Sequence, residues 1–145
     1  MKQVLEAIVG LQWGDEGKGK IVDAAAYRAS LDEKRRTIVI RYNGGPNAGH
    51  SVYMRKGDKI IPFVTHAAPT GLVSDVDIGI GPQVAFDPEK FMEEMKKAYE
   101  LCNYSGKILI SERTGILLKY HKDLDAWREN NHQGIGTTKL GIGPF

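Results

Sequence analysis

The sequence predicts an α/β fold in which a mixed, largely parallel sheet is flanked by helices and accompanied by a β-hairpin. Two observations favour this class. Short runs of β-branched and other apolar residues alternate with longer segments of helical periodicity, as in chains that build parallel sheets. Glycine is also enriched, with 17 glycines among 145 residues against a usual share of about 7 %. Most of these glycines lie in three clusters, which predict ligand-binding loops, the first of them a P-loop-like phosphate-binding loop.

The first half of the chain is expected to hold two strands, a helix and a hairpin. Residues 4–9 are almost continuously apolar, which is typical of a buried parallel strand. The alanine-rich segment 20–28 favours a helix, and the β-branched run 37–42 predicts the second strand. Two further apolar runs on either side of a Lys-Gly-Asp turn at 56–58 predict a hairpin over 51–63.

The second half is expected to continue the alternation of strands and helices. Residues 77–80 predict a strand, and an Asp-Pro-Glu sequence at 87–89 supplies an N-cap, a proline at the first helical position and an acid in the first turn. Apolar residues at helical spacing carry that helix to about Cys102. A further strand is expected at 107–110 and a last helix at 120–130.

The composition limits the class of protein. The length predicts one domain over residues 1–145. Twenty basic and eighteen acidic residues leave a net charge of +2, which argues against a nucleic-acid or membrane-surface partner. No apolar run approaches the roughly 18–20 residues of a membrane span, and the first residues do not read as a signal peptide. The single cysteine, Cys102, cannot form an internal disulfide, so a cytoplasmic location is expected.

The first glycine cluster, residues 10–20, joins the first predicted strand to the first predicted helix. Amides at a helix N-terminus bind phosphate readily, and glycine lets the backbone approach it. Residues 14–20 match the G-x-x-x-x-G-K part of a P-loop, but Ile21 stands where that motif has the hydroxyl that holds Mg²⁺. Asp15 is therefore interpreted as a metal ligand or a proton acceptor. The alternative is that Asp15 and Glu16 only cap the helix.

Two further clusters, 41–51 and 134–144, complete the predicted site. The second follows a predicted strand, so we expect it to share one crevice with the first. Asn47 offers a donor and an acceptor, and His50 can donate to a developing charge at neutral pH. The third cluster has paired hydroxyls and free amides suited to another phosphate. Taken alone, His50 is more often structural and the third cluster is equally well a flexible tail; together the loops favour a ligand site.

These clusters resemble the signature motifs of the adenylosuccinate synthetase family. The similar segments are Gln-Trp-Gly-Asp-Glu-Gly-Lys-Gly-Lys at 12–20, Asn-Ala-Gly-His at 47–50, Gly-Thr-Thr at 136–138 and Gly-Ile-Gly-Pro at 141–144. The likeness covers essentially the whole chain. It implies a GTP-dependent ligase of purine nucleotide biosynthesis, which joins IMP and L-aspartate into adenylosuccinate through a 6-phosphoryl-IMP intermediate and releases GDP and phosphate.

The resemblance also implies roles for individual residues. Asp15 is expected to be the general base that takes the N1 proton of IMP and a ligand of Mg²⁺, His50 the general acid, and Lys18 the third catalytic residue, which neutralises phosphate charge. The Gly49 carbonyl is expected to complete part of the metal site. The expected GTP-binding residues are Gly14, Asp15, Glu16, Gly17, Lys18, Gly19, Lys20, Gly49, His50 and Ser51. The expected IMP-binding residues are Asp15, Glu16, Gly17, Lys18, Asn47, Ala48, Gly49, His50 and Thr138.

The chain also departs from the family pattern. Lys139 and Leu140 stand where the family usually has Gly-Arg, and Asn43 and Pro46 stand where Gln and His are common. A modified purine nucleotide is therefore an alternative substrate. Family members are much longer and form homodimers, so we expect this chain to be an N-terminal portion that does not complete the reaction alone. A non-catalytic nucleotide- or phosphate-binding module is the other alternative.

Overall fold

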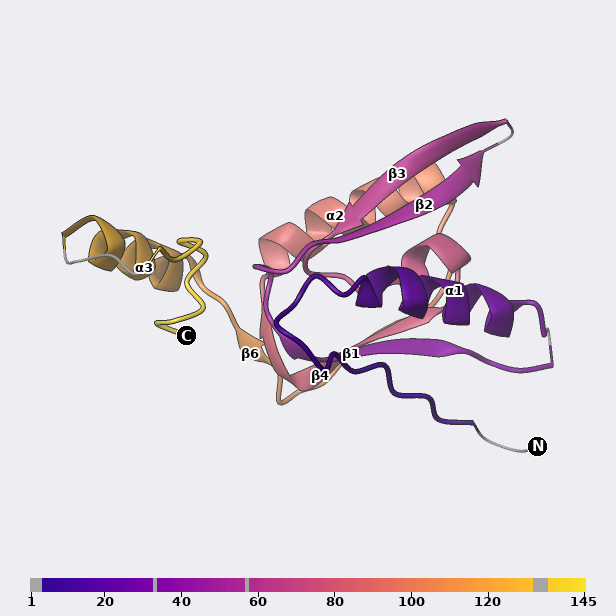
Figure 1. Ribbon diagram of the computed structural model, residues 1–145, viewed down its shortest axis with the longest axis horizontal. Coiled ribbons are helices and arrows are strands. Elements are labelled where there is room, and N and C mark those ends of the chain that lie inside the picture. The colour runs from indigo at the N-terminus through magenta and orange to yellow at the C-terminus, as the bar shows by residue number, and fades with distance from the viewer. Residues whose placement is uncertain (1–3, 33, 57, 132–135) are drawn as a thin grey trace.

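A parallel sheet forms the centre of the fold. The computed structural model describes residues 4–32, 34–56, 58–131 and 136–145 (Figure 1). The sheet has the strand order β1-β4-β5, and the short β6 pairs with the end of β4, every pair being parallel. These strands are β1 (Ile38–Gly44), β4 (Asp77–Phe86), β5 (Ile108–Ile110) and β6 (Gly115–Ile116). The predicted α/β class with a largely parallel sheet is confirmed.

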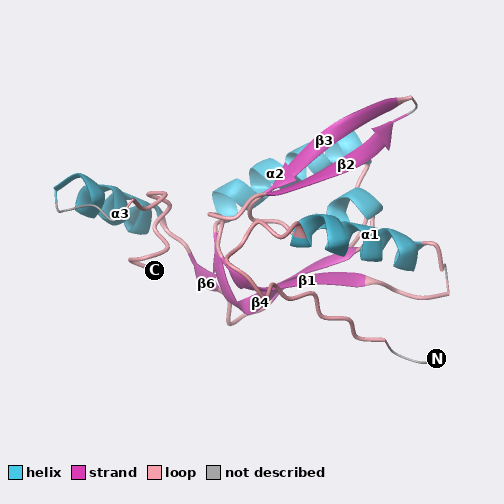
Figure 2. Cartoon of the chain, in the orientation of Figure 1, coloured by secondary structure: helices cyan, strands magenta, loops and turns pink. Residues whose placement is uncertain are grey.

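The first two α-helices lie beside this sheet, and the last lies apart from it near the C-terminus, as Figure 2 shows. In the described residues they are α1 (Lys18–Ser30), the 3₁₀ turn η1 (Thr70–Ser74), α2 (Pro88–Cys102) and α3 (Lys119–Asn131). The predicted cap of α2 is present, since the Asp87 side chain accepts a hydrogen bond from the Lys90 amide at 3.1 Å. Within the described ranges, every helix is too short or too polar to cross a bilayer.

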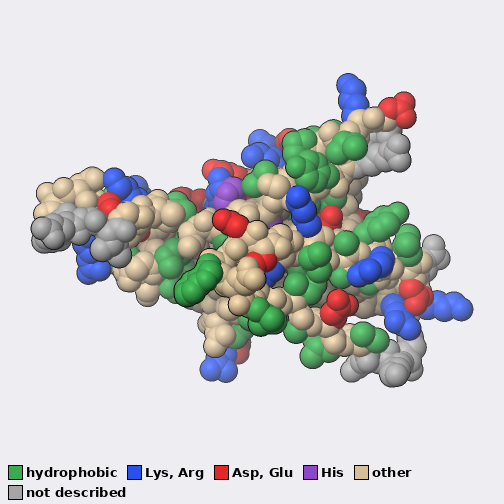
Figure 3. Space-filling view, in the orientation of Figure 1, with side chains coloured by type: hydrophobic (Ala, Val, Ile, Leu, Met, Phe, Trp, Pro, Cys, Tyr) green, Lys and Arg blue, Asp and Glu red, His purple; other side chains and the backbone are tan. Residues whose placement is uncertain are grey.

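The hairpin forms where it was predicted, from β2 (His50–Lys56) and β3 (Lys59–Thr65). Gly57 of its turn lies outside the described residues. The two strands make an antiparallel sheet of their own and do not join the parallel sheet. One face, with the cross-strand pair Val52 and Phe63, is buried in the core. The other face exposes Tyr53 and Ile60, and Figure 3 shows hydrophobic side chains at the surface of the hairpin.

The core lies where β4, α2 and the inner face of the hairpin meet. Its aromatic pair, Phe86 and Phe91, packs edge to face with ring centroids 5.1 Å apart. Leu72 of η1 is completely buried there. The other buried hydrophobic members are Val52, Phe63, Ala67, Ala68, Ile78, Ile80, Val84, Met95, Ala98 and Tyr104. Burial of these apolar side chains stabilises the arrangement that carries the loops described below.

Strand β4 is longer than the predicted strand 77–80 and continues to Phe86. Gly81 and Pro82 are residues that usually interrupt a strand. The structure accommodates them in a bulge, because the register with β1 shifts between Arg41 and Asn43. A Cβ at position 81 would lie 3.1 Å from the Tyr42 Cα. Glycine therefore fits where the two backbones approach closely, and a larger residue would need the backbone of β1 to shift.

The predicted strand at residues 4–9 is wrong. The segment is not a strand, and it pairs with no strand among the described residues. Val4 and Leu5 are 69 % and 96 % exposed. Backbone amides and carbonyls of a strand need a partner strand to bond with, and an apolar sequence alone does not supply one.

Candidate functional site

The first glycine loop is sharply curved. Gly14, Asp15 and Gly17 have φ angles of 113°, 54° and 79°, in the left-handed region that glycine adopts freely and aspartate only sparingly. The Gly17 carbonyl accepts hydrogen bonds from the amides of Lys20 at 3.0 Å and Ile21 at 3.3 Å, which begins α1. This turn leaves the Asp15 side chain exposed to solvent.

The Glu16 carboxylate is held by donors of the same loop. It accepts a hydrogen bond from the Gln12 amide at 2.9 Å and another from the Lys18 ammonium. A Cβ at Gly10 would lie 2.6 Å from this carboxylate, so the loop closes tightly around it. The Lys18 and Gln12 hydrogen bonds lower the pKa of Glu16. The alternative that acidic side chains cap α1 is wrong, because the N-cap is Gly17 and no side chain caps this helix.

The first and second glycine loops meet at Gly19 and His50. Gly19 is buried in the first turn of α1, and a Cβ there would lie 2.7 Å from the His50 Cβ and 3.0 Å from its Nδ1. The imidazole of His50, the first residue of β2, therefore packs on the backbone of α1. The structure thus brings the two loops into contact, although the strand expected before the first loop does not form.

The second and third loops meet at Gly45 and Ile142. A Cβ at Gly45 would overlap the Ile142 Cδ1, so the third loop packs against the second where a side chain is missing. Gly134 and Ile135 of the third cluster lie outside the described residues. The rest of the loop is ordered by α3, because the buried Asp125 carboxylate accepts hydrogen bonds from the Thr137 hydroxyl at 3.2 Å and the Gly141 amide at 2.9 Å.

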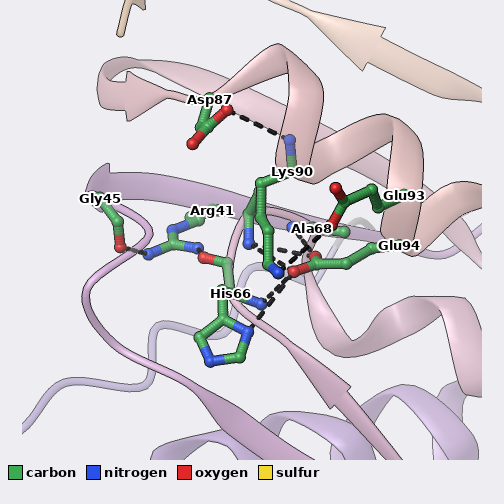
Figure 4. Close-up of polar contacts among 9 residues, drawn as sticks. Arg41, Gly45, His66, Ala68, Asp87, Lys90, Glu93 and Glu94 are labelled. Carbon is green, nitrogen blue, oxygen red and sulfur yellow. Dashed lines mark hydrogen bonds and ion pairs between the residues drawn. The ribbon is translucent and has the colours of Figure 1, made fainter. Parts of the chain in front are cut away.

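Sequence reasoning missed a cluster of polar residues behind the second loop, shown in Figure 4. The Arg41 guanidinium donates to the carbonyls of Gly45 and His66, and so ties the second loop to the segment after β3. Glu94 of α2 is 2 % exposed and accepts hydrogen bonds from three consecutive amides that begin at His66. Its partners lie more than 25 residues away in sequence, but a glutamate on the apolar face of a predicted helix was a usable signal.

His50 lies in a positively charged, half-buried environment. Burial lowers the pKa of its imidazole, and the charges of Arg41, Lys18 and His66 lower it further. These basic groups come from β1, from the start of α1 and from the segment after β3. Basic groups that repel a proton at one point attract an anion there, so the arrangement suits a phosphorylated ligand.

The other predicted residues lie at the surface of the loops. Lys20 extends over the Tyr53 ring, with its Nζ 6.0 Å from the ring centroid. Pro46, one of the departures from the family pattern, is buried, whereas Asn43 is exposed. The exposed predicted site residues are Gly14, Asp15, Glu16, Gly17, Lys20, Asn47, Ala48, Gly49, Ser51 and Thr138.

The two residues predicted to bind a metal ion, Asp15 and Gly49, are both exposed. In the part of the chain that the structure describes, no three acidic, histidine or cysteine side chains gather into a metal site. An exposed carboxylate at Asp15 and a backbone carbonyl at Gly49 are oxygen donors of the kind Mg²⁺ accepts. Mg²⁺ is commonly held by one or two carboxylates together with phosphate oxygens of a nucleotide.

Comparison with known proteins finds one family. A sequence profile of adenylosuccinate synthetase matches residues 7–145. The chain is 42 % identical over 140 residues to adenylosuccinate synthetase of Desulfitobacterium hafniense, covering 94 % of this chain and 30 % of the relative. It is 40 % identical over 148 residues to the chloroplastic adenylosuccinate synthetase 1 of Physcomitrium patens, covering 99 % of this chain and 27 % of the relative. The chain therefore spans less than a third of the length of these relatives.

Two solved structures share the fold of this chain. Fully ligated adenylosuccinate synthetase from Plasmodium falciparum superposes with a TM-score of 0.72 at 34 % identity, covering 93 % of this chain and 30 % of that one. The succinoaminodeoxyadenylate synthetase of cyanophage S-2L, bound to dGMP and dATP, superposes with a TM-score of 0.58 at 24 % identity over 80 % of this chain and 30 % of that one. The cyanophage structure shares the fold.

Proposed function

Because the chain belongs to the adenylosuccinate synthetase family, we propose that it supplies the phosphate-handling loops of that reaction. The reaction is the GTP-dependent ligation of IMP and L-aspartate to adenylosuccinate. The observation that carries the proposal is the meeting of the three glycine loops, at Gly19 with His50 and at Gly45 with Ile142. Phosphoryl transfer depends mainly on positioning and charge neutralisation, and converging loops with basic residues provide both.

Asp15 is the general base and His50 the general acid in this proposal. Asp15 accepts the proton from N1 of IMP, and the O6 atom then attacks the γ-phosphorus of GTP while GDP departs. His50 donates a hydrogen bond to the phosphate oxygens as charge moves across them. The amine of L-aspartate then displaces phosphate from C6. Because Asp15 acts on a protonated N1, its presence favours IMP over a purine that lacks this proton.

Lys18 and the amides of the first loop hold the phosphates of GTP. In the free chain the Glu16 carboxylate accepts hydrogen bonds from the Gln12 amide and the Lys18 ammonium. A phosphate needs donors of the same kind. A bound phosphate therefore displaces Glu16 from Lys18. Asp15 and the Gly49 carbonyl would hold Mg²⁺, which neutralises phosphate charge when bound. Asn47 and Thr138 would contact IMP.

The proposal is tested in a complete enzyme in which this chain replaces the matching residues of a bacterial relative. We expect adenylosuccinate formation, which Asp15→Asn abolishes while GTP affinity changes little. His50→Asn lowers turnover by about 10²–10⁴-fold. Asp58→Asn, at the exposed hairpin turn, is the matched control and leaves turnover unchanged. Normal turnover with Asp15→Asn would refute the role of Asp15.

The isolated chain separates this proposal from a non-catalytic binding module. Calorimetry with GTP and IMP in the presence of Mg²⁺ measures binding, and a phosphate-release assay with L-aspartate measures turnover. Binding by the isolated chain, together with an inactive chimaera, would favour the binding module. We also propose a cytoplasmic homodimer, as the family resemblance implies; sedimentation of the active chimaera as a monomer would contradict the dimer.

A further inference from the structure

We propose that His66 is a positioning residue for the second glycine loop: Glu94 fixes the backbone of His66, and the imidazole supports the backbone at Gly49. The relevance to catalysis rests on the proposed function, because Gly49 and His50 are the residues whose placement it sets. His66 directly follows β3 and belongs to none of the three glycine loops. The contacts that carry the inference come from three sides.

The first contact is with Glu94, on the buried face of α2. Its carboxylate accepts the His66 amide at 2.7 Å, the Ala67 amide at 3.1 Å and the Ala68 amide at 2.8 Å. The same carboxylate lies 3.6 Å from the imidazole Nδ1 of His66. A buried acceptor with three backbone donors has a fixed place. Glu94 therefore fixes the backbone of His66, and the imidazole lies beside the same carboxylate.

The second contact is with Gly49. In the hairpin register His50 pairs with Thr65, so the next position along the strands places Gly49 opposite His66. A Cβ at Gly49 would lie 2.8 Å from the His66 Nε2 and 3.1 Å from its Cδ2. The ring therefore packs directly on the Gly49 backbone, in the space that a side chain would occupy at any other residue.

The third contact is through Arg41 of β1. Its guanidinium donates to the carbonyl of His66 and to the carbonyl of Gly45 at the other end of the loop. Burial lowers the pKa of Arg41, and the charge of Glu94 opposes that shift. The second loop is thus fixed at Gly45 by Arg41 and at Gly49 by the imidazole. Removing the ring frees the end of the loop that holds the proposed metal-binding carbonyl and His50.

The first experiment uses the free 145-residue chain and measures amide hydrogen exchange by NMR. His66→Asn keeps a nitrogen near the place of Nδ1, within reach of Glu94, but lacks the Nε2 that touches Gly49. We expect the amides of residues 48–51 to exchange about tenfold faster or more, with an unchanged thermal midpoint. Glu94→Gln should accelerate the same amides. Glu93→Gln, at the adjacent exposed glutamate, is the matched control and should not.

The second experiment tests the steric contact. Gly49→Ala should lower the thermal midpoint in the wild-type chain, because the new Cβ meets the imidazole. In the His66→Ala background the same substitution should lower it by less than half as much. Exchange within twofold of wild type in folded His66→Asn, or an equal effect of Gly49→Ala in both backgrounds, would overturn the proposal.

The third experiment asks whether the position matters for catalysis. In the chimaera, His66→Asn should lower kcat about tenfold while the KM for IMP stays within about twofold, at a temperature where both proteins are folded. An unchanged kcat would overturn the catalytic part of the proposal. An inactive wild-type chimaera would overturn the proposed function instead, and the exchange and thermal measurements would still decide whether His66 positions the loop.

Discussion

Replacing Gly19 by alanine tests the contact between the first two loops. Gly19 is the second residue of α1 and is buried. A Cβ there would lie 2.7 Å from the His50 Cβ and 2.9 Å from its Cγ. Two opposing effects follow from the added methyl group. It favours the helix, and it forces the imidazole of His50 or the start of α1 to move.

The magnitudes determine the sign of the change in stability. Alanine in place of glycine stabilises a helix by about 0.5–1 kcal/mol, and overpacking of a close contact costs about 1–3 kcal/mol. Gly19→Ala is therefore expected to lower the free energy of unfolding by up to about 2.5 kcal/mol. In a His50→Gly background no Cβ remains to be met, so the same substitution should raise it by about 0.5–1 kcal/mol. The coupling between the two positions is then about 1–3 kcal/mol.

Urea unfolding of the wild type, the two single variants and the double variant, monitored by circular dichroism, measures this coupling. Gly143→Ala is the matched control, because a Cβ at Gly143 meets no atom within 4 Å. The control should change stability by less than about 0.5 kcal/mol in either background. If Gly19→Ala changes stability equally with and without His50, the two loops do not press on one another and the geometry of the candidate site is refuted.

Three further predictions concern stability, measured by urea unfolding. Lys139 has a φ of 55°, where a residue with a Cβ is strained. Lys139→Gly should therefore raise the free energy of unfolding by up to about 1 kcal/mol, after glycine's greater freedom in the unfolded chain is subtracted. Lys139→Ala should not raise it, and a lower free energy of unfolding with glycine would contradict the backbone strain. Asp87→Ala removes both the α2 cap and the 2.7 Å ion pair with Lys122 and should lower the free energy of unfolding by about 1–3 kcal/mol. Asp87→Asn keeps the cap and should recover the part of this loss that is due to capping. Equal stability of both variants and wild type would contradict the prediction. Burial raises the pKa of Tyr104 to about 12 from 10.0. Because the folded pKa lies above the unfolded one, the contribution of Tyr104 to stability is full below pH 10. It is lost between pH 10 and 12, by at most about 2.7 kcal/mol. Tyr104→Phe should flatten that decline, and an unchanged pH profile would exclude Tyr104 as its cause.

The elements that could be predicted from the sequence are those whose signal is local. Asp87 and Pro88 define the start of α2 because capping and the proline restriction involve neighbouring residues only. The hairpin was predictable because its turn and alternating residues lie together. The strand at residues 4–9 failed because a strand exists only with a partner strand, and apolar composition does not specify one. The extent of β4 was missed because a bulge opposite β1 absorbs Gly81 and Pro82.

The family, the three glycine loops and the chemical types of side chain that they carry all follow from the order of residues. How the loops meet depends on the fold, because contacts such as Gly19 with His50 and Gly45 with Ile142 join residues far apart in the chain. The same holds for the support behind the second loop. Glu94 lies 28 residues after His66. The fold determines which amides lie within hydrogen-bonding distance of its buried carboxylate.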